Sequence, residues 1–303
     1  MRGRPFDLVK IRYLGGATYR SADGELYLRV GDRAAVRREY ALGRALQDQG
    51  VAVPAVLAHG DLAGDRAYVI ERSVGAGSFG ERFAAETRRH GTVDDGTFAA
   101  FLETTAAYVA IQCRHPLSFG AAAPDGLDAV VRWSHARAEH GRELPDDRLT
   151  VAYRTAGDRL SDRPWCLSLF DLNPFNVLPG CLIDLEIGGP APFGYDALTS
   201  VHFGHFWPPD RIAYVLTPAQ IGQYERRLDD VARAAGWPPP TAARNEFLLL
   251  KAVWASARDA YGTSSPQAPT DLWAWRVEVR DRCAARYLAG QSLDPAAFHA
   301  IKA

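Results

Sequence analysis

The chain is 303 residues long, more than one small hydrophobic core usually holds, so two lobes or domains are expected. Hydrophobic residues make up 47% of the chain and charged residues 23%, and the formal net charge of -1 argues against nucleic acid or a membrane surface as a partner. The four cysteines form no CxxC pair, the N-terminus lacks the apolar core of a signal peptide, and no apolar run reaches the roughly 20 residues of a membrane span, so we expect a cytoplasmic protein with reduced thiols.

The first part of the chain predicts a small α+β unit. Alternating polar and apolar residues indicate a strand over residues 25–30. A helix is expected over residues 34–49, with Gly50 as its stop. Residues 56–58 and 67–70 predict a pair of strands joined by a polar turn.

The composition changes beyond Glu71. Residues 73–80 contain three glycines and predict a flexible connection, so we place a lobe boundary there, between residues 1–72 and residues 73–303. Helices are expected over residues 97–114 and 126–142. Most of residues 209–303 also has helical character, apart from a break at three consecutive prolines, residues 238–240.

The segment 167–186, LSLFDLNPFNVLPGCLIDLE, has the residues that chemistry requires. Asp171 and Asn176 flank a tight loop, and the Pro179-Gly180 pair predicts a hairpin that returns Asp184 to the same loop. Phosphoryl transfer uses such a set, because one carboxylate orients an attacking hydroxyl while an amide and a second carboxylate hold Mg²⁺. The alternative is a turn-rich strand junction in which Asp and Asn only cap backbone groups.

DLNPFNVL at 171–178, followed by IDLE at 183–186, resembles the catalytic region of the aminoglycoside phosphotransferase / choline kinase-like family. That family reads H-G-D-x-x-x-x-N-V-L and then I-D-W-E or I-D-F-E. Its next landmark is matched by Gly194-Tyr195-Asp196-Ala197-Leu198, in which we expect Asp196 to cap a helix. The resemblance implies an α+β, bilobal, protein-kinase-like fold with a small β-rich N-lobe and a mainly helical C-lobe.

The resemblance extends through the N-terminal unit. It implies that the loop covering the nucleotide phosphates is Gly15-Gly16-Ala17-Thr18. Arg29 stands at the position of the cation over the phosphates, Glu39 at that of its acidic partner, and Glu71 at the end of the strand that leads to the adenine. The implied cofactors are ATP or GTP and Mg²⁺, with Asp171 as the catalytic base and Asn176 and Asp184 as the metal ligands.

Two residues depart from the family pattern. Leu169 and Phe170 stand where the family has His and Gly, and Phe170 replaces a residue that permits unusual backbone angles. We therefore keep two functions open. One is a kinase that phosphorylates a hydroxyl of a small molecule, an antibiotic among the candidates. The other is a catalytically weak or inactive kinase-fold module that binds nucleotide. A protein kinase fits less well, because Asp-Phe-Gly and Ala-Pro-Glu are missing.

The acceptor pocket of the family is usually built by its C-terminal helices. There the sequence mixes aromatic and charged residues, of which the tryptophans are better explained as core than as stacking surfaces. No acidic cluster of the kind that a polycationic acceptor needs is evident. The residues are Trp254, Arg258, Asp259, Tyr261, Asp271, Trp273 and Trp275.

Overall fold

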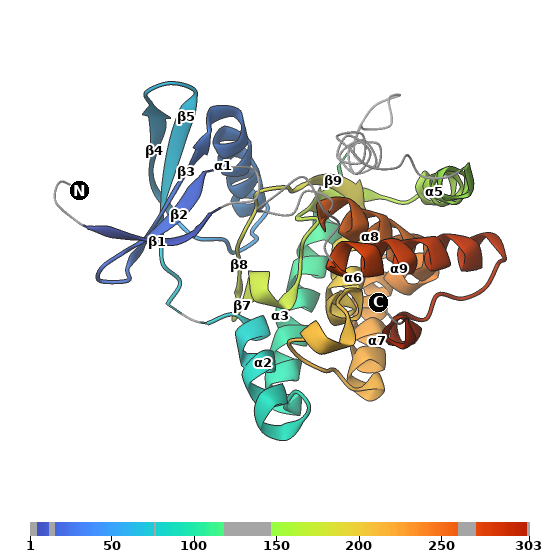
Figure 1. Cartoon of the computed structure of the whole chain (residues 1–303). Coiled ribbons are helices and arrows are strands. Elements are labelled where there is room, and N and C mark those ends of the chain that lie inside the picture. The colour runs from blue at the N-terminus through green and yellow to red at the C-terminus, as the bar shows by residue number, and fades with distance from the viewer. Residues whose placement is uncertain (1–4, 12–15, 76, 118–146, 260–270, 302–303) are drawn as a thin grey trace.

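The N-terminal part of the chain forms one antiparallel sheet of five strands (Figure 1). In chain order they are β1 (Phe6–Ile11), β2 (Ala17–Ser21), β3 (Leu26–Asp32), β4 (Val56–Leu62) and β5 (Arg66–Arg72). The order across the sheet is β1-β2-β3-β5-β4, so β3 lies at its centre. The predicted strand over residues 25–30 is confirmed as β3, and the predicted strand pair as β4 and β5.

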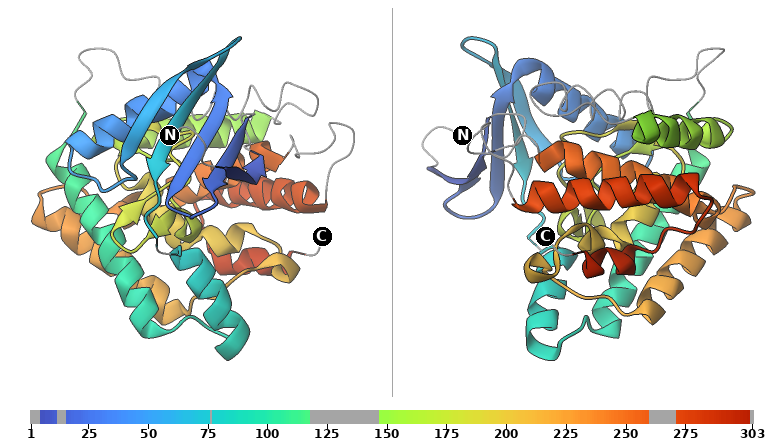
Figure 2. Two further views of the ribbon diagram at one scale, coloured as in Figure 1. Left: turned by 90° about the vertical axis from the view of Figure 1, so that its left-hand side faces the viewer. Right: turned by 45° about the vertical axis from the view of Figure 1, so that its right-hand side comes forward.

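One helix, α1 (Arg33–Asp48), follows β3 directly and confirms the helix predicted for residues 34–49. Asp32 caps it, with the side chain accepting a hydrogen bond from Ala35 N. The buried face of α1 packs along the sheet and carries Val36, Leu42 and Leu46 together with one charged residue, Glu39. Figure 2 shows α1 standing between the sheet and the helical part of the chain.

The rest of the chain is mainly helical and forms the larger lobe. Its α-helices are α2 (Phe79–His90), α3 (Asp95–Arg114), α5 (Asp147–Leu160), α6 (Tyr195–Val201), α7 (Pro218–Ala234), α8 (Arg244–Asp259) and α9 (Asp271–Leu288). Short 3-10 helices are η1 (Pro174–Asn176), η2 (Phe203–Phe206), η3 (Pro209–Arg211), η4 (Pro240–Ala243) and η5 (Pro295–Ala300). Two small antiparallel pairs join β6 (Trp165–Ser168) to β9 (Gly189–Pro192) and β7 (Val177–Leu178) to β8 (Cys181–Leu182).

This computed structural model describes residues 5–11, 16–75, 77–117, 147–259 and 271–301. The helix predicted for residues 126–142 lies outside them. Among the described residues, no helix combines the length and the apolar character needed to span a membrane. The cysteines at 113, 166, 181 and 283 are all buried and free.

The predicted flexible connection at residues 73–80 is wrong at its end, because α2 already begins at Phe79. Ser78 accepts a hydrogen bond from Glu81 N, and the Glu81 side chain accepts one from Ser78 N, which completes a capping box. The three glycines of this segment indicate flexibility when they are considered alone, but the Ser78 and Glu81 side chains mark the start of the helix. The helices α2 and α5 were both missing from the sequence-based prediction.

Two hydrophobic cores stabilise the larger lobe. One is built mainly from α5, α8 and α9, and the other from α2, α3 and α7 together with Leu42 and Leu46 of α1. The segment after β6 runs between them, since Leu169 packs into the second core and its neighbour Phe170 into the first. Both side chains are at most 9% exposed. The loop that follows is thus anchored on both sides.

Candidate active site

Arg29 on β3 lies among three carboxylates, and its side chain is 11% exposed. Its Nη1 lies 2.6 Å from Glu39 Oε1, and its Nε lies 2.9 Å from Glu71 Oε2. Its Nη1 also lies 3.7 Å from Asp184 Oδ1. Burial alone would lower the pKa of Arg29, but the three carboxylates raise it above its ordinary value. The guanidinium is therefore a permanent cation held by three separate segments.

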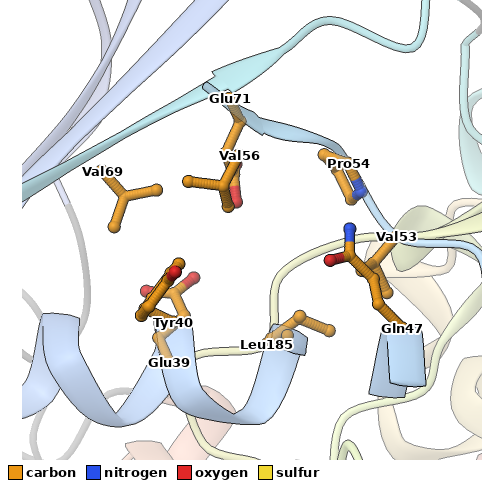
Figure 3. A pocket seen from close by; sticks show the side chains of 10 residues that line it. Glu39, Tyr40, Gln47, Val53, Pro54, Val56, Val69, Glu71 and Leu185 are labelled. Carbon is orange, nitrogen blue, oxygen red and sulfur yellow. The ribbon is translucent and has the colours of Figure 1, made fainter. Parts of the chain in front are cut away.

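The strand register explains how this cluster forms. β3 and β5 pair with Tyr27 opposite Glu71, so Glu71 shares a face of the sheet with Arg29, two residues beyond Tyr27. Glu39 approaches from α1, which covers this face. Figure 3 shows Glu39 rising from α1 toward Glu71 on β5 around a narrow pocket that Leu185 also lines. The structure thus brings together Arg29, Glu39 and Glu71.

The loop holding Asp171 is shaped by its own polar side chains. Asn176 Nδ2 donates to the backbone oxygen of Asp171 over 2.9 Å, and Asn173 Nδ2 donates to the same oxygen over 3.2 Å. Asn173 Oδ1 accepts from Phe175 N and so caps η1, which begins at Pro174. The Asp171 side chain is 13% exposed. Pro174 and the two asparagines therefore fix the backbone that carries Asp171.

The predicted hairpin is present and brings Asp184 back to this loop. β7 and β8 pair with Val177 opposite Leu182, and Ile183 N donates to Asn176 O over 3.0 Å. Asp184 follows at once with a φ of 61°, a left-handed conformation that non-glycine residues seldom adopt. Its Oδ2 accepts a hydrogen bond from Lys10 Nζ over 2.9 Å. Asp184 thus lies between cations of β1 and β3.

Phe170 also has a left-handed backbone, with a φ of 59°. The position where the family has Gly therefore keeps the conformation that Gly permits, although a bulky side chain occupies it. Its ring packs edge-on against Tyr195, with the ring centroids 6.3 Å apart. Replacement of the family Gly by Phe170 thus leaves the loop conformation in place, and its cost is backbone strain at Phe170.

Asp196 holds the loop and does not cap its own helix, so that prediction is wrong. The residue at the start of α6 is Gly194, and the helix has no side-chain cap. Asp196 Oδ2 instead accepts hydrogen bonds from Leu169 N and from the Tyr108 hydroxyl. Burial raises the pKa of Asp196, and the bond from Leu169 N is among the contacts that oppose this.

A cavity of about 570 Å³ lies between the sheet, the start of α2 and the hairpin, and neither Asp171 nor Glu39 is among its lining residues. Its lining includes Thr18, Arg29, Glu71, Asn176 and Asp184 among the residues singled out from the sequence. Apolar and aromatic side chains complete its walls, from β3, from the hairpin and from η1: Tyr27, Leu178, Ile183 and Phe175. Such a mixed lining suits a ligand with a flat apolar part and a charged part.

The segment before β2 requires glycine at one position. Gly16 has a φ of 93°, and a Cβ placed there would lie 2.1 Å from the backbone oxygen of Val30. Ala17 and Thr18 are buried in β2, and within the described part of the chain the Thr18 hydroxyl has no hydrogen-bond partner. Gly15 lies outside the described residues. An unsatisfied buried hydroxyl at a cavity wall suits a polar ligand.

The donor set of the cavity fits a hard cation. The amide nitrogen of Asn176 donates to the Asp171 backbone, which leaves its side-chain oxygen available to a ligand in the cavity that Asp184 also lines. Amide and carboxylate oxygens suit Mg²⁺, which takes its remaining ligands from water and phosphate. Among the described residues, no group of three or more His, Cys, Asp or Glu is placed to hold a metal by itself.

Two lysines belong to the site and were missed in the sequence. Lys10 on β1 lines the cavity and binds Asp184. Lys251 on α8 is buried, with Nζ 3.5 Å from Asp171 Oδ1 and 3.5 Å from the Phe170 oxygen. A signal for Lys251 exists, because it interrupts the apolar run FLLLKAVWA. A lysine inside such a run needs a buried partner.

The aromatic and charged residues considered for an acceptor pocket differ in burial, and some of them lie outside the described residues. Trp254 and Trp275 are buried core residues, as the sequence favoured, and Trp273 is partly exposed. Tyr261 lies outside the described residues, and so do the side chains of Arg258 and Asp259. The described residues therefore do not define an acceptor pocket.

The sequence model of the phosphotransferase enzyme family matches residues 16–242. No curated protein sequence matches the chain. Several solved structures share its fold. The Plasmodium vivax ethanolamine kinase is 11% identical with a TM-score of 0.61, covering 93% of this chain and 82% of its own.

Two further structures were solved with bound ligands. The Streptomyces rimosus aminoglycoside phosphotransferase APH(3'')-Id, in complex with ADP and streptomycin, is 16% identical with a TM-score of 0.57 and covers 84% of this chain and 92% of its own. The amicoumacin kinase hAmiN, in complex with AMP-PNP and Ca²⁺, is 11% identical with a TM-score of 0.60 and covers 98% and 92%. At these identities the likeness extends to the fold.

Proposed function

Because the chain belongs to the phosphotransferase enzyme family, we propose that it transfers the γ-phosphoryl group of ATP or GTP to a hydroxyl of a small molecule. The observation that carries this proposal is the contact between Arg29 of the sheet and Asp184 of the hairpin at the wall of one cavity. It joins a fixed cation to a carboxylate beside the Asp171 loop, as phosphoryl transfer requires.

In this proposal Asp171 is the catalytic base. The acceptor hydroxyl attacks the γ-phosphorus and gives its proton to the Asp171 carboxylate, while the bond to the β–γ bridging oxygen breaks and the nucleoside diphosphate leaves. The loop supports this role because Asn173 and Asn176 fix the Asp171 backbone. Because these hydrogen bonds fix the Asp171 backbone, the base needs little reorganisation before the reaction.

Asn176 and Asp184 are proposed to hold Mg²⁺ through their side-chain oxygens. The ion supplies neutralisation of the charge on the phosphate oxygens. Lys10 and Arg29 pair with the Asp184 carboxylate. Both cations line the cavity, so both are in place to contact nucleotide phosphates when Asp184 takes the metal.

The remaining site residues are proposed to bind the nucleotide. Glu39 and Glu71 hold the Arg29 guanidinium over the phosphates, and the Thr18 hydroxyl and the Gly15-Gly16-Ala17 backbone cover them. Tyr27 and Ile183 offer apolar surface for the purine at the cavity wall. We also propose that the lobes divide after β5, between residues 72 and 73. A cytoplasmic location is part of the proposal, and the four free cysteines support it.

One observation favours a second function. The strained Phe170 and the apolar Leu169 directly precede Asp171, so a nucleotide-binding module with weak or no turnover is the alternative. The two functions share the nucleotide site and differ only in turnover. Nucleotide consumption that depends on an acceptor therefore distinguishes the kinase from the binding module.

The test is a mass-spectrometric screen for a product heavier by one phosphate. Purified protein is incubated with Mg²⁺, ATP or GTP, and a panel of hydroxyl compounds that includes streptomycin, amicoumacin and ethanolamine, after the similar structures. We expect one acceptor to be phosphorylated, and Asp171→Asn to abolish the product. Stabilisation by nucleotide without a product from any acceptor would establish the binding module instead.

A further inference from the structure

Lys251 is a buried charge in the middle of the helical lobe. Its side chain is 2% exposed, and it stands on α8 among residues that belong to the hydrophobic core, Leu250 and Ala252 on either side. Removing an ammonium group from water costs much free energy unless a partner compensates for it. A lysine at this position therefore has to be explained by what surrounds its Nζ.

The Nζ group lies at the catalytic loop. It is 3.5 Å from Asp171 Oδ1 and 3.5 Å from the Phe170 backbone oxygen, and 3.9 Å from the centroid of the Trp254 ring. The carboxylate supplies the opposite charge, and the aromatic face supplies a further favourable contact for a cation. Lys251 thus reaches the carboxylate assigned as the base and the strained residue before it.

The loop before Asp171 is held from two sides. Asp196 on α6 accepts a hydrogen bond from Leu169 N, and Lys251 on α8 faces the Phe170 oxygen. The left-handed backbone of Phe170 turns the chain between these two anchors. A non-glycine residue keeps such a conformation only when its surroundings fix it. The contact from Lys251 on α8 to the Phe170 oxygen is one of the contacts that fix it.

We propose that Lys251 is a positioning residue that holds the Asp171 carboxylate in its reactive orientation from α8, which contributes none of its described residues to the nucleotide cavity. The inference rests on the proposed function for its effect on turnover, but the pairing of Lys251 with Asp171 stands without it. Lys251 fixes Oδ1 through charge and fixes the preceding peptide through the Phe170 oxygen. It compensates in this chain for Leu169 and Phe170, which bring no polar side chain to the loop.

The alternative is a lysine that only stabilises the fold. Both readings predict that Lys251→Met lowers the melting temperature, so stability of this single variant decides nothing. They differ in turnover. A positioning role predicts that kcat falls while KM for ATP stays unchanged, because Lys251 does not line the nucleotide cavity.

The pairing is tested first, by thermal unfolding of wild type, Lys251→Met, Asp171→Asn and the double variant. Asp171→Asn removes the carboxylate that lies 3.5 Å from the Lys251 ammonium, whereas the double variant contains neither of these two charges. Asp196, which also interacts electrostatically with Lys251, is present in all four proteins and therefore cancels in the comparison. We expect the double variant to lose less stability than the sum of the two single losses. Additive losses would overturn the pairing. If Lys251→Met does not fold alone, a folded double variant supports the pairing and an unfolded one contradicts it.

Turnover is tested next, as ADP formed from Mg·ATP with the acceptor found in the screen. We expect Lys251→Met to lower kcat on the order of 100-fold with KM for ATP unchanged, the size of effect that a small displacement of a reacting group produces. Lys251→Arg, which keeps the charge, should recover part of the rate. The control is Ser256→Ala on the same helix, because the Ser256 hydroxyl donates to Val253 O within its own turn.

The outcomes separate the two proposals. Wild-type kcat in Lys251→Met, or an equal loss in Ser256→Ala, would show that Lys251 only supports the fold. Absence of turnover in the wild type with every acceptor would contradict the proposed function, while the unfolding cycle would still decide whether Lys251 and Asp171 are paired.

Discussion

Arg29 Nη1 and Asp184 Oδ1 lie 3.7 Å apart, although one residue belongs to the sheet and the other to the hairpin of the helical lobe. The same guanidinium is bound by Glu39 and Glu71, so its position is fixed from within the N-lobe. Asp184 accepts a second cation, Lys10. The Asp184 carboxylate therefore has cationic partners before a metal ion binds, and it would keep an opposite charge beside it if the ion displaced them.

Asp184→Ala should abolish the Mg²⁺-dependent stabilisation of the protein by ATP. A ligand at about 100 times its Kd stabilises the folded state by about 2.7 kcal/mol, which raises Tm by several degrees in a chain of this size. Differential scanning fluorimetry with ATP, with and without Mg²⁺, measures the shift. Asp61→Ala, which removes an exposed carboxylate paired with Arg37, should keep it. An unchanged shift in Asp184→Ala would exclude Asp184 as a metal ligand.

Phe170→Gly tests the strain at the catalytic loop. The ring is 9% exposed in a hydrophobic core, so its removal costs about 3–5 kcal/mol, whereas relief of the left-handed backbone returns only about 1 kcal/mol. Loss of packing wins, and we expect a net destabilisation of about 2–4 kcal/mol by urea unfolding. Phe170→Ala is the matched variant, because it removes the ring but keeps the strain.

The strain at Phe170 is the difference between these two variants. Phe170→Gly should be more stable than Phe170→Ala by about 1 kcal/mol, the reverse of the order at a position with negative φ. Equal stability, or a more stable alanine variant, would mean that the backbone at Phe170 is not strained.

Gly80→Ala should destabilise the protein even though Gly80 lies in a helix. Alanine is favoured over glycine in a helix by about 1 kcal/mol, but the new Cβ would lie 2.4 Å from the ring of Phe175, and such overpacking costs about 1–3 kcal/mol. Phe175 stands between Asp171 and Asn176, so we also expect turnover to fall.

The control for Gly80 is Gly96→Ala in α3, where nothing lies within 4 Å of the added Cβ. That variant should gain up to about 1 kcal/mol, because only the helix preference acts. Urea unfolding of both variants measures the contrast. A stabilised Gly80→Ala variant would contradict the close packing of α2 on η1.

Three histidines that are partly or fully shielded from water should make the protein less stable in acid. Burial lowers the pKa of His205 to about 3, and also lowers the pKa of His202 and of His299. The unfolded chain binds protons near pH 6.5, while folded His205 does not bind one until about pH 3. Stability is therefore full above pH 6.5 and falls between pH 6.5 and 3, by up to about 1.4 kcal/mol per pH unit for each histidine.

Urea unfolding at several pH values between 7 and 4.5 measures this dependence. His205→Phe should flatten the slope, because one of the protons taken up on unfolding disappears. The exposed His90 serves as the control, and His90→Phe should leave the slope as in the wild type. A slope unchanged in His205→Phe would show that another group controls the loss of stability in acid.

Much of the fold followed from local patterns. The strand β3, the helix α1 and the hairpin β7–β8 were predicted because each is encoded within a few neighbouring residues, by alternation, by an apolar face or by Pro179-Gly180. The order of motifs likewise indicated the family that the sequence model matches. Helix α2 was missed because three glycines obscured the Ser78–Glu81 capping box.

The sequence by itself determined which groups stand on the Asp171 loop, since Asp171, Asn176 and the hairpin are joined by contacts between near neighbours. Only the tertiary structure decided what holds that loop. Asp196 and Lys251 act over 27 and 81 positions of sequence, from helices whose packing no local pattern specifies. Long-range partners of buried charges depend on how whole elements dock, because a charge pairs with whatever the fold places beside it.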